Sequence, residues 1–237
     1  SDKITATDGG KVYLGSVDLH GGGTIKGGSL DVDSTVKAGA VTAQGASAEV
    51  NLASLLLHEG SEVGQINGQL KMDATTGDVI AHEGARIDVV GVHLNNSKIN
   101  GALNVDGELK AKTGNLVAHQ GAELGVASLL MDNSTAENIN IHGMEANLQN
   151  VTVEEGGKAY FSTLKMDNSH AGNIDFKAFS RVGSDVTVPS GATLNVASAV
   201  FNNTNVSGDV KLDLYADVGG IEMGSDSVVM VGGVNFE

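Results

Sequence analysis

The chain has 237 residues and a formal net charge of −15, with 14 Lys and Arg against 29 Asp and Glu; without a basic run to neutralise a phosphate backbone, a nucleic-acid partner is excluded. The 41% hydrophobic content predicts a folded chain, but only 3% of residues are aromatic, so the core must be built mainly from Val, Leu, Ile and Ala. No apolar stretch approaches the roughly 20 residues that span a bilayer, so membrane insertion is not expected. The absence of Cys excludes disulfides and leaves the compartment open.

A repeated pattern runs through the whole chain, which predicts one domain over residues 1–237. The copies begin at Ile4, Val41, Val79, Leu116, Val151, Val186 and Ile221. The steps between them are 37, 38, 37, 35, 35 and 35 residues. A fixed period of this size is typical of solenoids, in which each unit stacks on the next.

Each copy begins with two apolar residues at alternate positions, has Gly near the sixth place, and continues with two more apolar pairs. In chain order these pairs include Val50/Leu52 with Leu55/Leu57, Ile87/Val89 with Val92/Leu94, Leu124/Val126 with Leu129/Met131, Leu194/Val196 with Ala199/Phe201, and Val229/Val231 with Val234/Phe236. Alternation with a period of two predicts short strands with one buried face. Helical periodicity is absent.

Two small residues separate the pairs and predict a tight corner that stays in the core. Examples are Gly15-Ser16, Ala53-Ser54, Ala127-Ser128, Ala197-Ser198 and Gly232-Gly233. After the second pair comes a column of Asn residues at Asn96, Asn133, Asn168 and Asn203. Asn tolerates left-handed backbone, and stacked amides can bond along an axis. The place before this column is always polar: His20, His58, Asn95, Asp132, Asp167 and Asn202.

These patterns predict an all-β fold, a single-stranded right-handed parallel β-helix. Leu103, Val105 and Leu109 repeat the rhythm of the Ile87 segment, so we expect two rungs of about 18 residues in each repeat. Such a chain would form about thirteen rungs and a rod roughly 60 Å long, at ~4.8 Å per rung. Right-handedness follows the usual sense of parallel crossover connections.

The most conspicuous candidate site is the pair His82 and His119, in the segments AHEG and AHQG. Two rungs would separate the rings by roughly 10 Å, too far for one metal ion. We therefore expect solvent-facing turn histidines, and the same for His93, His142 and His170.

Paired carboxylates would point to a glycosidase or a polysaccharide lyase, since some parallel β-helices are such enzymes. Asp132 and Asp167 align, but at two rungs apart they would lie near or beyond the ~9.5 Å limit for an inverting pair. Neither Arg86 nor Arg181 has an obvious acidic cluster beside it in the sequence. We therefore expect no enzymatic activity and name no catalytic residue.

Two segments weakly resemble ligand loops. Residues 132–140 and the pair Asp31/Asp33 are faintly similar to calcium loops but lack their fixed spacing, so calcium is left open without a specific motif. The stretch GGGTIKGG at 21–28 lacks the Gly-Lys-Ser/Thr ending of a phosphate loop. No cofactor-binding or metal-binding residue is named.

The V-x-A-x-x-G-A-x-L-x-V rhythm, the Asn turns and the Gly/Ala/Ser/Asn/Thr bias resemble bacterial surface β-helices, namely autotransporter passengers and filamentous-haemagglutinin-like adhesins. The resemblance covers essentially all 237 residues. It implies a secreted, surface-displayed β-helix used for adhesion, for self-association or as a stalk. An autotransporter assignment would require a passenger fragment, because the chain has no outer-membrane barrel.

The first ten residues do not resemble a signal peptide, and the pattern stops in mid-repeat at Phe236-Glu237. We expect either a slice of a longer solenoid or ends that stack on other copies. The main hypothesis is thus a non-catalytic extracellular structural or adhesive β-helix, with a host or neighbouring-cell surface as a further partner. The alternative is a carbohydrate-active enzyme on the same scaffold.

Overall fold

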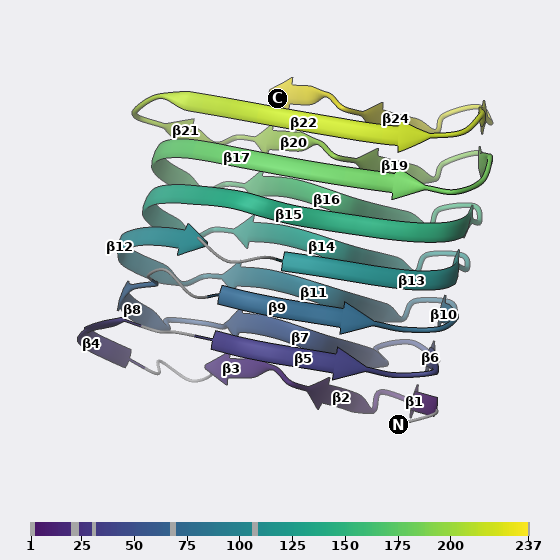
Figure 1. Cartoon of the computed structure of the whole chain (residues 1–237), viewed down its shortest axis with the longest axis horizontal. Coiled ribbons are helices and arrows are strands. Elements are labelled where there is room, and N and C mark those ends of the chain that lie inside the picture. Colours follow the sequence, from purple (N-terminus) through teal and green to yellow (C-terminus); the bar gives the residue numbers. More distant parts are fainter. Residues whose placement is uncertain (1–2, 20–23, 30–31, 67–69, 106–108, 237) are drawn as a thin grey trace.

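The computed structural model describes residues 3–19, 24–29, 32–66, 70–105 and 109–236. Within these ranges every regular element is a β-strand, and the strands pair in parallel in two sheets of 15 and 10 strands. This part of the chain has no helix with the length and apolarity needed to cross a bilayer. The predicted all-β solenoid is confirmed (Figure 1).

Each repeat forms one full turn of the solenoid. Ile4 pairs with Val41, Val41 with Val79, and Val79 with Leu116. The same column continues through the later copies and ends at Ile221. Seven equivalent strands therefore lie one above another, and the chain makes about six turns.

The prediction of two rungs in each repeat is wrong. Leu103 lies in the wall opposite Ile87 and pairs with Ile139, one turn later in the chain. Both walls of a turn face the same core, so both carry the same alternation of apolar residues. In the sequence, the pattern of half a turn is therefore the same as the pattern expected for a whole turn. Six steps of ~4.8 Å give a stack about 29 Å tall instead of the expected rod of about 60 Å.

The 10-stranded sheet forms the far wall in Figure 1. Its strands are β2 (Lys11–Leu14), β3 (Val17–Leu19), β7 (Glu49–Leu57), β11 (Arg86–Asn95), β14 (Glu123–Asp132), β16 (Lys158–Asp167), β19 (Thr193–Val196), β20 (Ala199–Asn202), β24 (Val228–Val231) and β25 (Val234–Phe236).

The 15-stranded sheet forms the near wall and both lateral edges. Its strands are β1 (Lys3–Thr7), β4 (Thr24–Ser29), β5 (Val32–Lys37), β6 (Ala40–Gln44), β8 (Glu62–Gln65), β9 (Leu70–Thr75), β10 (Val79–Ala81), β12 (Lys98–Val105), β13 (Leu109–Ala118), β15 (Thr135–Val153), β17 (His170–Val182), β18 (Val186–Val188), β21 (Asn205–Val206), β22 (Val210–Val218) and β23 (Ile221–Met223). In Figure 1 the near strands run left to right and the far strands right to left while the chain climbs, which is a right-handed coil. The longest axis of the molecule lies along the strands and not along the stack.

The predicted corners are confirmed by the backbone. The residue at the corner of the 10-stranded sheet has positive φ in every turn, between 43° and 62°: Gly15, Ala53, Val90, Ala127, Ser162, Ala197 and Gly232. Gly15 and Gly232 adopt this conformation without strain because they lack the Cβ atom that crowds the following carbonyl oxygen, whereas Ala53, Ala127, Ser162 and Ala197 adopt it as fully buried small residues. Val90 is the exception, since a β-branched residue at φ 62° is strained.

The Asn column also adopts the left-handed conformation, with φ between 44° and 46° at all four positions. The amides stack along the axis at one step, where Asn203 Nδ2 donates to Asn168 Oδ1 at 2.7 Å. Asn133 Nδ2 instead donates to Asp132 Oδ1 in its own turn, at 2.9 Å. His20, assigned to the preceding polar column, lies outside the described residues.

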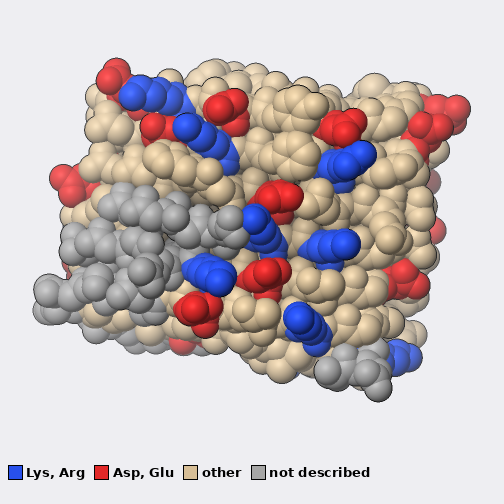
Figure 2. All heavy atoms as spheres, in the orientation of Figure 1, with Lys and Arg blue, Asp and Glu red and all other residues tan. Residues whose placement is uncertain are grey.

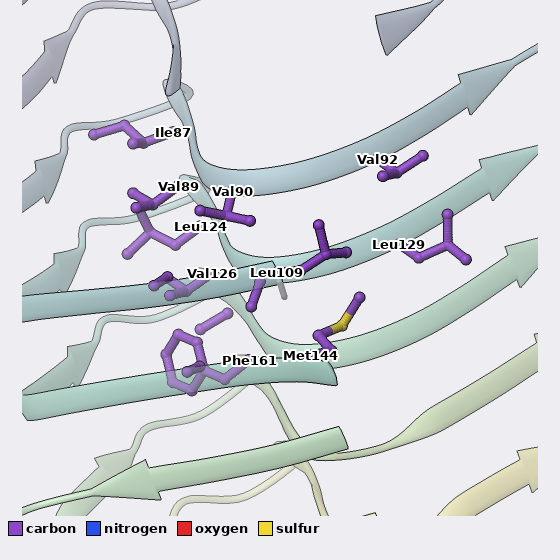
Figure 3. Packing of buried hydrophobic residues seen from close by; sticks show 14 of the residues in the cluster. Ile87, Val89, Val90, Val92, Leu109, Leu124, Val126, Leu129, Met144 and Phe161 are labelled. Carbon is purple, nitrogen blue, oxygen red and sulfur yellow. The ribbon is translucent and has the colours of Figure 1, made fainter. Parts of the chain in front are cut away.

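The core is a single aliphatic cluster between the two walls (Figure 3). Ile87, Val89 and Val92 of one wall point toward the side that carries Leu109 and Met144 of the other. Rings are few, but fully buried Phe161 and Phe176 are among the largest core side chains.

The outer face of the near wall mixes both signs of charge (Figure 2). Arg181 lies opposite Asp217 in the next turn, with Nε and Oδ2 3.3 Å apart. Lys110 lies opposite Glu145 in the same way, 3.9 Å between Nζ and Oε2. Among the described residues of this face, such paired charges leave no extended basic surface.

Candidate functional site

The outward side of the 10-stranded sheet carries a groove, because its strands bend at the corner. In β11 the outward side chains of Arg86 and Asp88 precede the corner at Val90, and His93 follows it. Asp88 Oδ1 and His93 Nε2 lie 3.4 Å apart, so the two halves of the strand meet across the bend. Further lining comes from neighbouring turns: Leu56, Glu123, Leu130, Asp132, Lys165 and Asp167.

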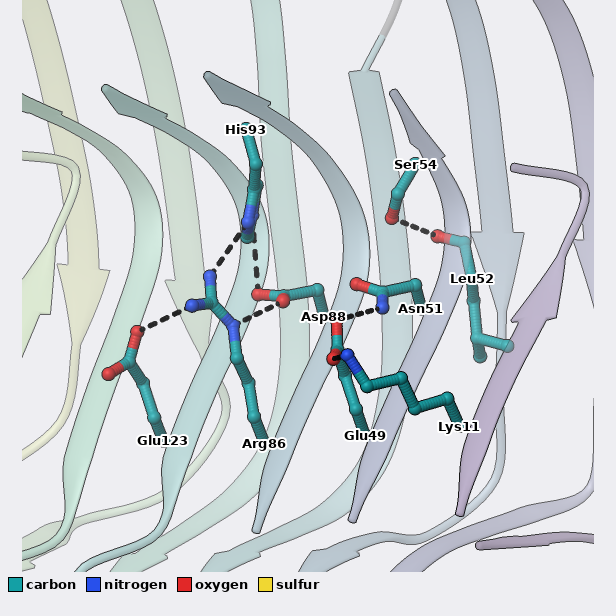
Figure 4. A network of polar contacts seen from close by, with 9 residues as sticks. All are labelled: Lys11, Glu49, Asn51, Leu52, Ser54, Arg86, Asp88, His93 and Glu123. Atoms are coloured by element: carbon teal, nitrogen blue, oxygen red, sulfur yellow. Dashed lines mark hydrogen bonds and ion pairs between the residues drawn. The ribbon is translucent and has the colours of Figure 1, made fainter. Parts of the chain in front are cut away.

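Arg86 is the centre of a polar cluster in this groove, formed by Arg86, Asp88, His93 and Glu123 (Figure 4). Arg86 Nε donates to Asp88 Oδ2 at 2.7 Å, and Nη2 contacts His93 Nδ1 at 2.7 Å. Nη1 lies 3.6 Å from Glu123 Oε1. A guanidinium has donors only, so His93 Nδ1 accepts, and the proton of the neutral ring sits on Nε2, facing Asp88.

Burial and mutual charge set the protonation of the Arg86 cluster. Burial raises the pKa of Asp88, and the charge on Arg86 offsets only part of that rise. Burial also lowers the pKa of His93 well below its ordinary value, and Arg86 lowers it further. For Arg86, burial acts to lower the pKa, but Asp88 and Glu123 raise it by more. Arg86 is therefore charged and His93 neutral near pH 7.

We expect the folded protein to lose stability as the pH falls below about 6.5, the value of an unperturbed His. The folded pKa of His93 is depressed, so the unfolded chain takes up the proton first, and the loss continues until the folded pKa is reached. One such group contributes up to about 1.4 kcal/mol per pH unit. At lower pH the raised pKa of Asp88 acts in the opposite direction.

Urea unfolding of the wild type and His93→Gln at about pH 8 and about pH 5.5 measures this contribution. The variant should lose less stability than the wild type between the two values. Equal losses in the two proteins would show that His93 does not carry the effect.

The Asp88 carboxylate of the Arg86 cluster is closed to a substrate, whereas 35% of the Arg86 side chain and 30% of the Glu123 side chain are exposed in the groove. Asp88 is fully buried, and its oxygens face Arg86 and His93, so a substrate has no route to this carboxylate. Both ring nitrogens of His93 also face protein groups. The arrangement suits a role in holding the bend of β11, because buried charges that satisfy one another fix a local conformation.

A second polar group lies one turn below. Glu49 accepts from Asn51 Nδ2 at 2.6 Å and lies 3.2 Å from Lys11 Nζ. Burial acts to raise the pKa of Glu49, but the hydrogen bonds from Asn51 and Lys11 lower it by more. Lys11, Glu49, Arg86 and Glu123 follow one another in successive turns, so charges of opposite sign alternate along the axis.

Asp132 and Asp167 lie in adjacent turns, directly opposite each other, and the predicted separation of two rungs is wrong. Adjacent turns are ~4.8 Å apart, close to the ~5–5.5 Å between the carboxyl groups of a retaining glycosidase. Both carboxylates already have partners. Asp132 accepts from Asn133, and Asp167 pairs with Lys165 and accepts from Asn202 at 2.7 Å.

His82 and His119 are also in adjacent turns, against the expectation of roughly 10 Å. Their ring centroids are 4.8 Å apart and their planes differ by 12°, so the imidazoles stack. His119 Nδ1 lies 2.9 Å from Glu154 Oε1 in the following turn. Both rings line a hollow at the edge of the solenoid, as expected of turn residues, but as a pair rather than singly.

Two other histidine predictions have different outcomes. His93 is not a solvent-facing turn residue, because it lies in strand β11 inside the Arg86 cluster. His142 is solvent-facing, with 46% of its side chain exposed and Nε2 3.3 Å from Asp175 Oδ1, but it lies in strand β15 and not in a turn. The statement that Arg86 lacks acidic neighbours is wrong, since Asp88 and Glu123 lie beside it.

The segments that weakly resemble ligand loops are mainly strands in the parts that the structure describes. Residues Thr135–Val153 are a continuous strand, so the 132–140 segment turns only at its start. Asp33 lies in β5, whereas Asp31 is outside the described residues. The second half of the 21–28 stretch belongs to β4, and residues 21–23 are not described. Within the described ranges no three His, Asp or Glu side chains are grouped to hold a metal ion.

Sequence reasoning missed the Arg86 cluster, although one signal was present. Arg86 and Asp88 alternate with the core residues Ile87 and Val89, which places both on the outward side of one strand. Their link to His93 depends on the bend at Val90, and the link to Glu123 depends on the length of a turn.

Comparison of the chain with protein-family models, with curated proteins and with solved structures gave no match.

Proposed function

We propose that the chain is a non-catalytic structural or adhesive solenoid of a bacterial surface, and that the turn formed by β22 to β25 stacks against another layer of parallel strands, from a second copy or from a continuation of the solenoid. The observation that carries this proposal is the edge formed by β22 to β25. Among the described strands, β22 pairs only with β17, and β24 only with β19. Their outer edges offer backbone donors and acceptors to a further strand.

Apolar side chains are also exposed to solvent at this edge. Tyr215 is 59% exposed and stacks on Phe179 of the preceding turn, with ring centroids 5.3 Å apart. Phe236 is 66% exposed and stacks on Phe201, with centroids 4.9 Å apart. Met223 and Val228 add further exposed apolar surface. Another layer of strands would extend both ring columns and cover this surface.

The edge formed by β1 to β5 has the matching pattern. Following the strand register through the stack places Phe236 in the column of Leu19 and Ile221 in the column of Ile4. The same procedure places Asp217 in the column of Lys37. A second copy added head to tail therefore sets apolar on apolar residues and Asp217 against Lys37. Such a contact is heterologous and does not close.

Sedimentation velocity and negative-stain microscopy over a range of protein concentrations test the stacking. The wild type should form assemblies that lengthen with concentration, and Phe236→Lys should stay monomeric because it buries a charge in the contact. Thr152→Lys adds the same charge on an exposed strand position in mid-stack and is the matched control. Short single particles of the wild type at every concentration would rule out self-stacking. Further strands of the same chain would then be what covers this edge.

Surface display is the part of the proposal that rests on the resemblance to surface β-helices. Antibody labelling of intact cells of the source organism, before and after permeabilisation, checks it. Signal on intact cells is expected, and signal only after permeabilisation would place the protein inside.

The groove favours a second candidate, a carbohydrate-active enzyme. Asp132 and Asp167 occupy neighbouring turns at the groove, with Tyr160 and Lys165 nearby. This candidate ranks lower because each carboxylate already has partners within the chain. Release of reducing ends from polysaccharides by the wild type, abolished in Asp167→Asn, would replace the structural proposal with the enzymatic one.

A further inference from the structure

Four successive turns place polar side chains in one column at the edge of the solenoid. In the column of strands that starts at β1, Gln44 is the last residue of β6, and His82, His119 and Glu154 directly follow β10, β13 and β15. The backbone N–H of His82 donates to Ala43 O at 2.8 Å, and the later turns repeat this bond. The register of the stack therefore fixes the backbone beneath these side chains. Among the four, His82 and His119 are the two imidazoles, and they are neighbours in the column.

Glu154 defines the tautomer of His119. Its Oε1 lies 2.9 Å from His119 Nδ1, so the carboxylate accepts the Nδ1 proton. In the neutral ring, the lone pair is then on Nε2. A carboxylate behind a His in this way is the common outer-shell arrangement of metal-binding histidines, since it orients the ring and raises its basicity. The parallel ring of His82 lies 4.8 Å away.

We propose that His82 and His119 together bind one divalent transition-metal ion that prefers imidazole, with Zn²⁺ as the representative. Glu154 is a positioning residue for His119. Imidazole nitrogens bind Zn²⁺ at about 2.0–2.1 Å, so the two donor nitrogens must approach to within about 4 Å. Because the in-plane lone pairs of the stacked rings run nearly parallel, the rings must rotate out of the stack to converge on one ion, and the 32% exposure of the His119 side chain leaves solvent space for that rotation.

The surroundings favour a cation. Glu83 lines the same hollow and is the nearest further carboxylate in the sequence, and water fills the remaining coordination positions. The net charge of −15 draws cations toward the molecule in general. Because the ion links two adjacent turns of the folded chain, its binding stabilises the native state. This inference does not depend on stacking between copies.

Isothermal titration with Zn²⁺, on protein prepared without a polyhistidine tag, tests the site. The wild type should bind one ion per chain and unfold at a higher temperature when it is bound. His82→Gln and His119→Gln should each weaken binding by at least about tenfold, and Glu154→Gln by about tenfold, as for other outer-shell partners. His142→Gln removes an exposed His elsewhere and should bind like the wild type.

Electron paramagnetic resonance with Cu²⁺ as the probe gives an independent readout. Nitrogen couplings from two imidazoles are expected in the wild type and from one in each His variant. Undetectable Zn²⁺ binding by the wild type at millimolar concentration would overturn the proposal. Unchanged binding by the double variant H82Q/H119Q, with the same unfolding temperature without metal, would overturn it as well.

Discussion

Replacing Arg86 by leucine is expected to lower the free energy of unfolding by about 3 kcal/mol. The substitution leaves the buried Asp88 carboxylate without its counter-charge and His93 Nδ1 without its donor. Breaking a buried ion pair usually costs about 3–5 kcal/mol, and the lower end applies because 35% of the Arg86 side chain is exposed. Urea or guanidinium unfolding measures the change.

Two controls separate the effect of leaving a buried charge without a partner from the effect of removing an arginine as such. The double variant Arg86→Leu/Asp88→Leu removes both charges and should recover a large part of the stability, since an apolar pair needs no counter-charge. Arg181→Leu breaks the pair with Asp217, whose partners are 65% and 54% exposed, and should cost less than about 1 kcal/mol. Equal losses in Arg86→Leu and Arg181→Leu would contradict the role given to the cluster.

Local features of the solenoid were predictable because they depend on single residues and their neighbours. The Asn found in four of the turns occupies left-handed backbone, where its short polar side chain is tolerated. Gly and small buried residues mark the corners, and the aliphatic alternation identifies the buried face. Each of these signals acts over two or three residues and needs no knowledge of the turn length.

The length of a turn was not predictable in the same way. Two walls that share a core have the same alternation, so the sequence fits half-turns stacked on each other as well as opposed walls. The apolar alternation alone does not distinguish the two, and the pairing of Leu103 with Ile139, instead of with Ile87, shows which one the chain adopts. The error then spread to the sites, since the His82–His119 and Asp132–Asp167 separations were both derived from the assumed turn.

The full repeat of 35–38 residues would have given the correct turn length. All seven copies have the corner and four of them have the Asn turn, but the half-period at Leu103 has neither of these features. A repeat unit is the shortest segment after which all features recur, not the apolar rhythm alone. With that criterion the amino-acid sequence by itself places His82 beside His119 and Arg86 beside Glu123.

Replacing Phe161 by alanine is expected to destabilise the fold by about 3–5 kcal/mol. The ring is fully buried and lies in a column between Val126 of the turn before and Val196 of the turn after. Its removal opens a cavity that these neighbours can fill only in part. Each turn of a solenoid contacts mainly its neighbours, so the loss falls on two interfaces in mid-stack. Chemical unfolding measures the change.

Phe236→Ala is the matched control for Phe161→Ala. The substitution is the same, but the Phe236 ring is 66% exposed and stacks on Phe201 on one side. At low protein concentration, where copies do not stack, this variant should lose less than about 1 kcal/mol, because little apolar surface leaves water there on folding. A Phe161→Ala loss no larger than that of Phe236→Ala would mean that the fifth turn repacks without its ring, and that the aliphatic columns alone hold the two walls together.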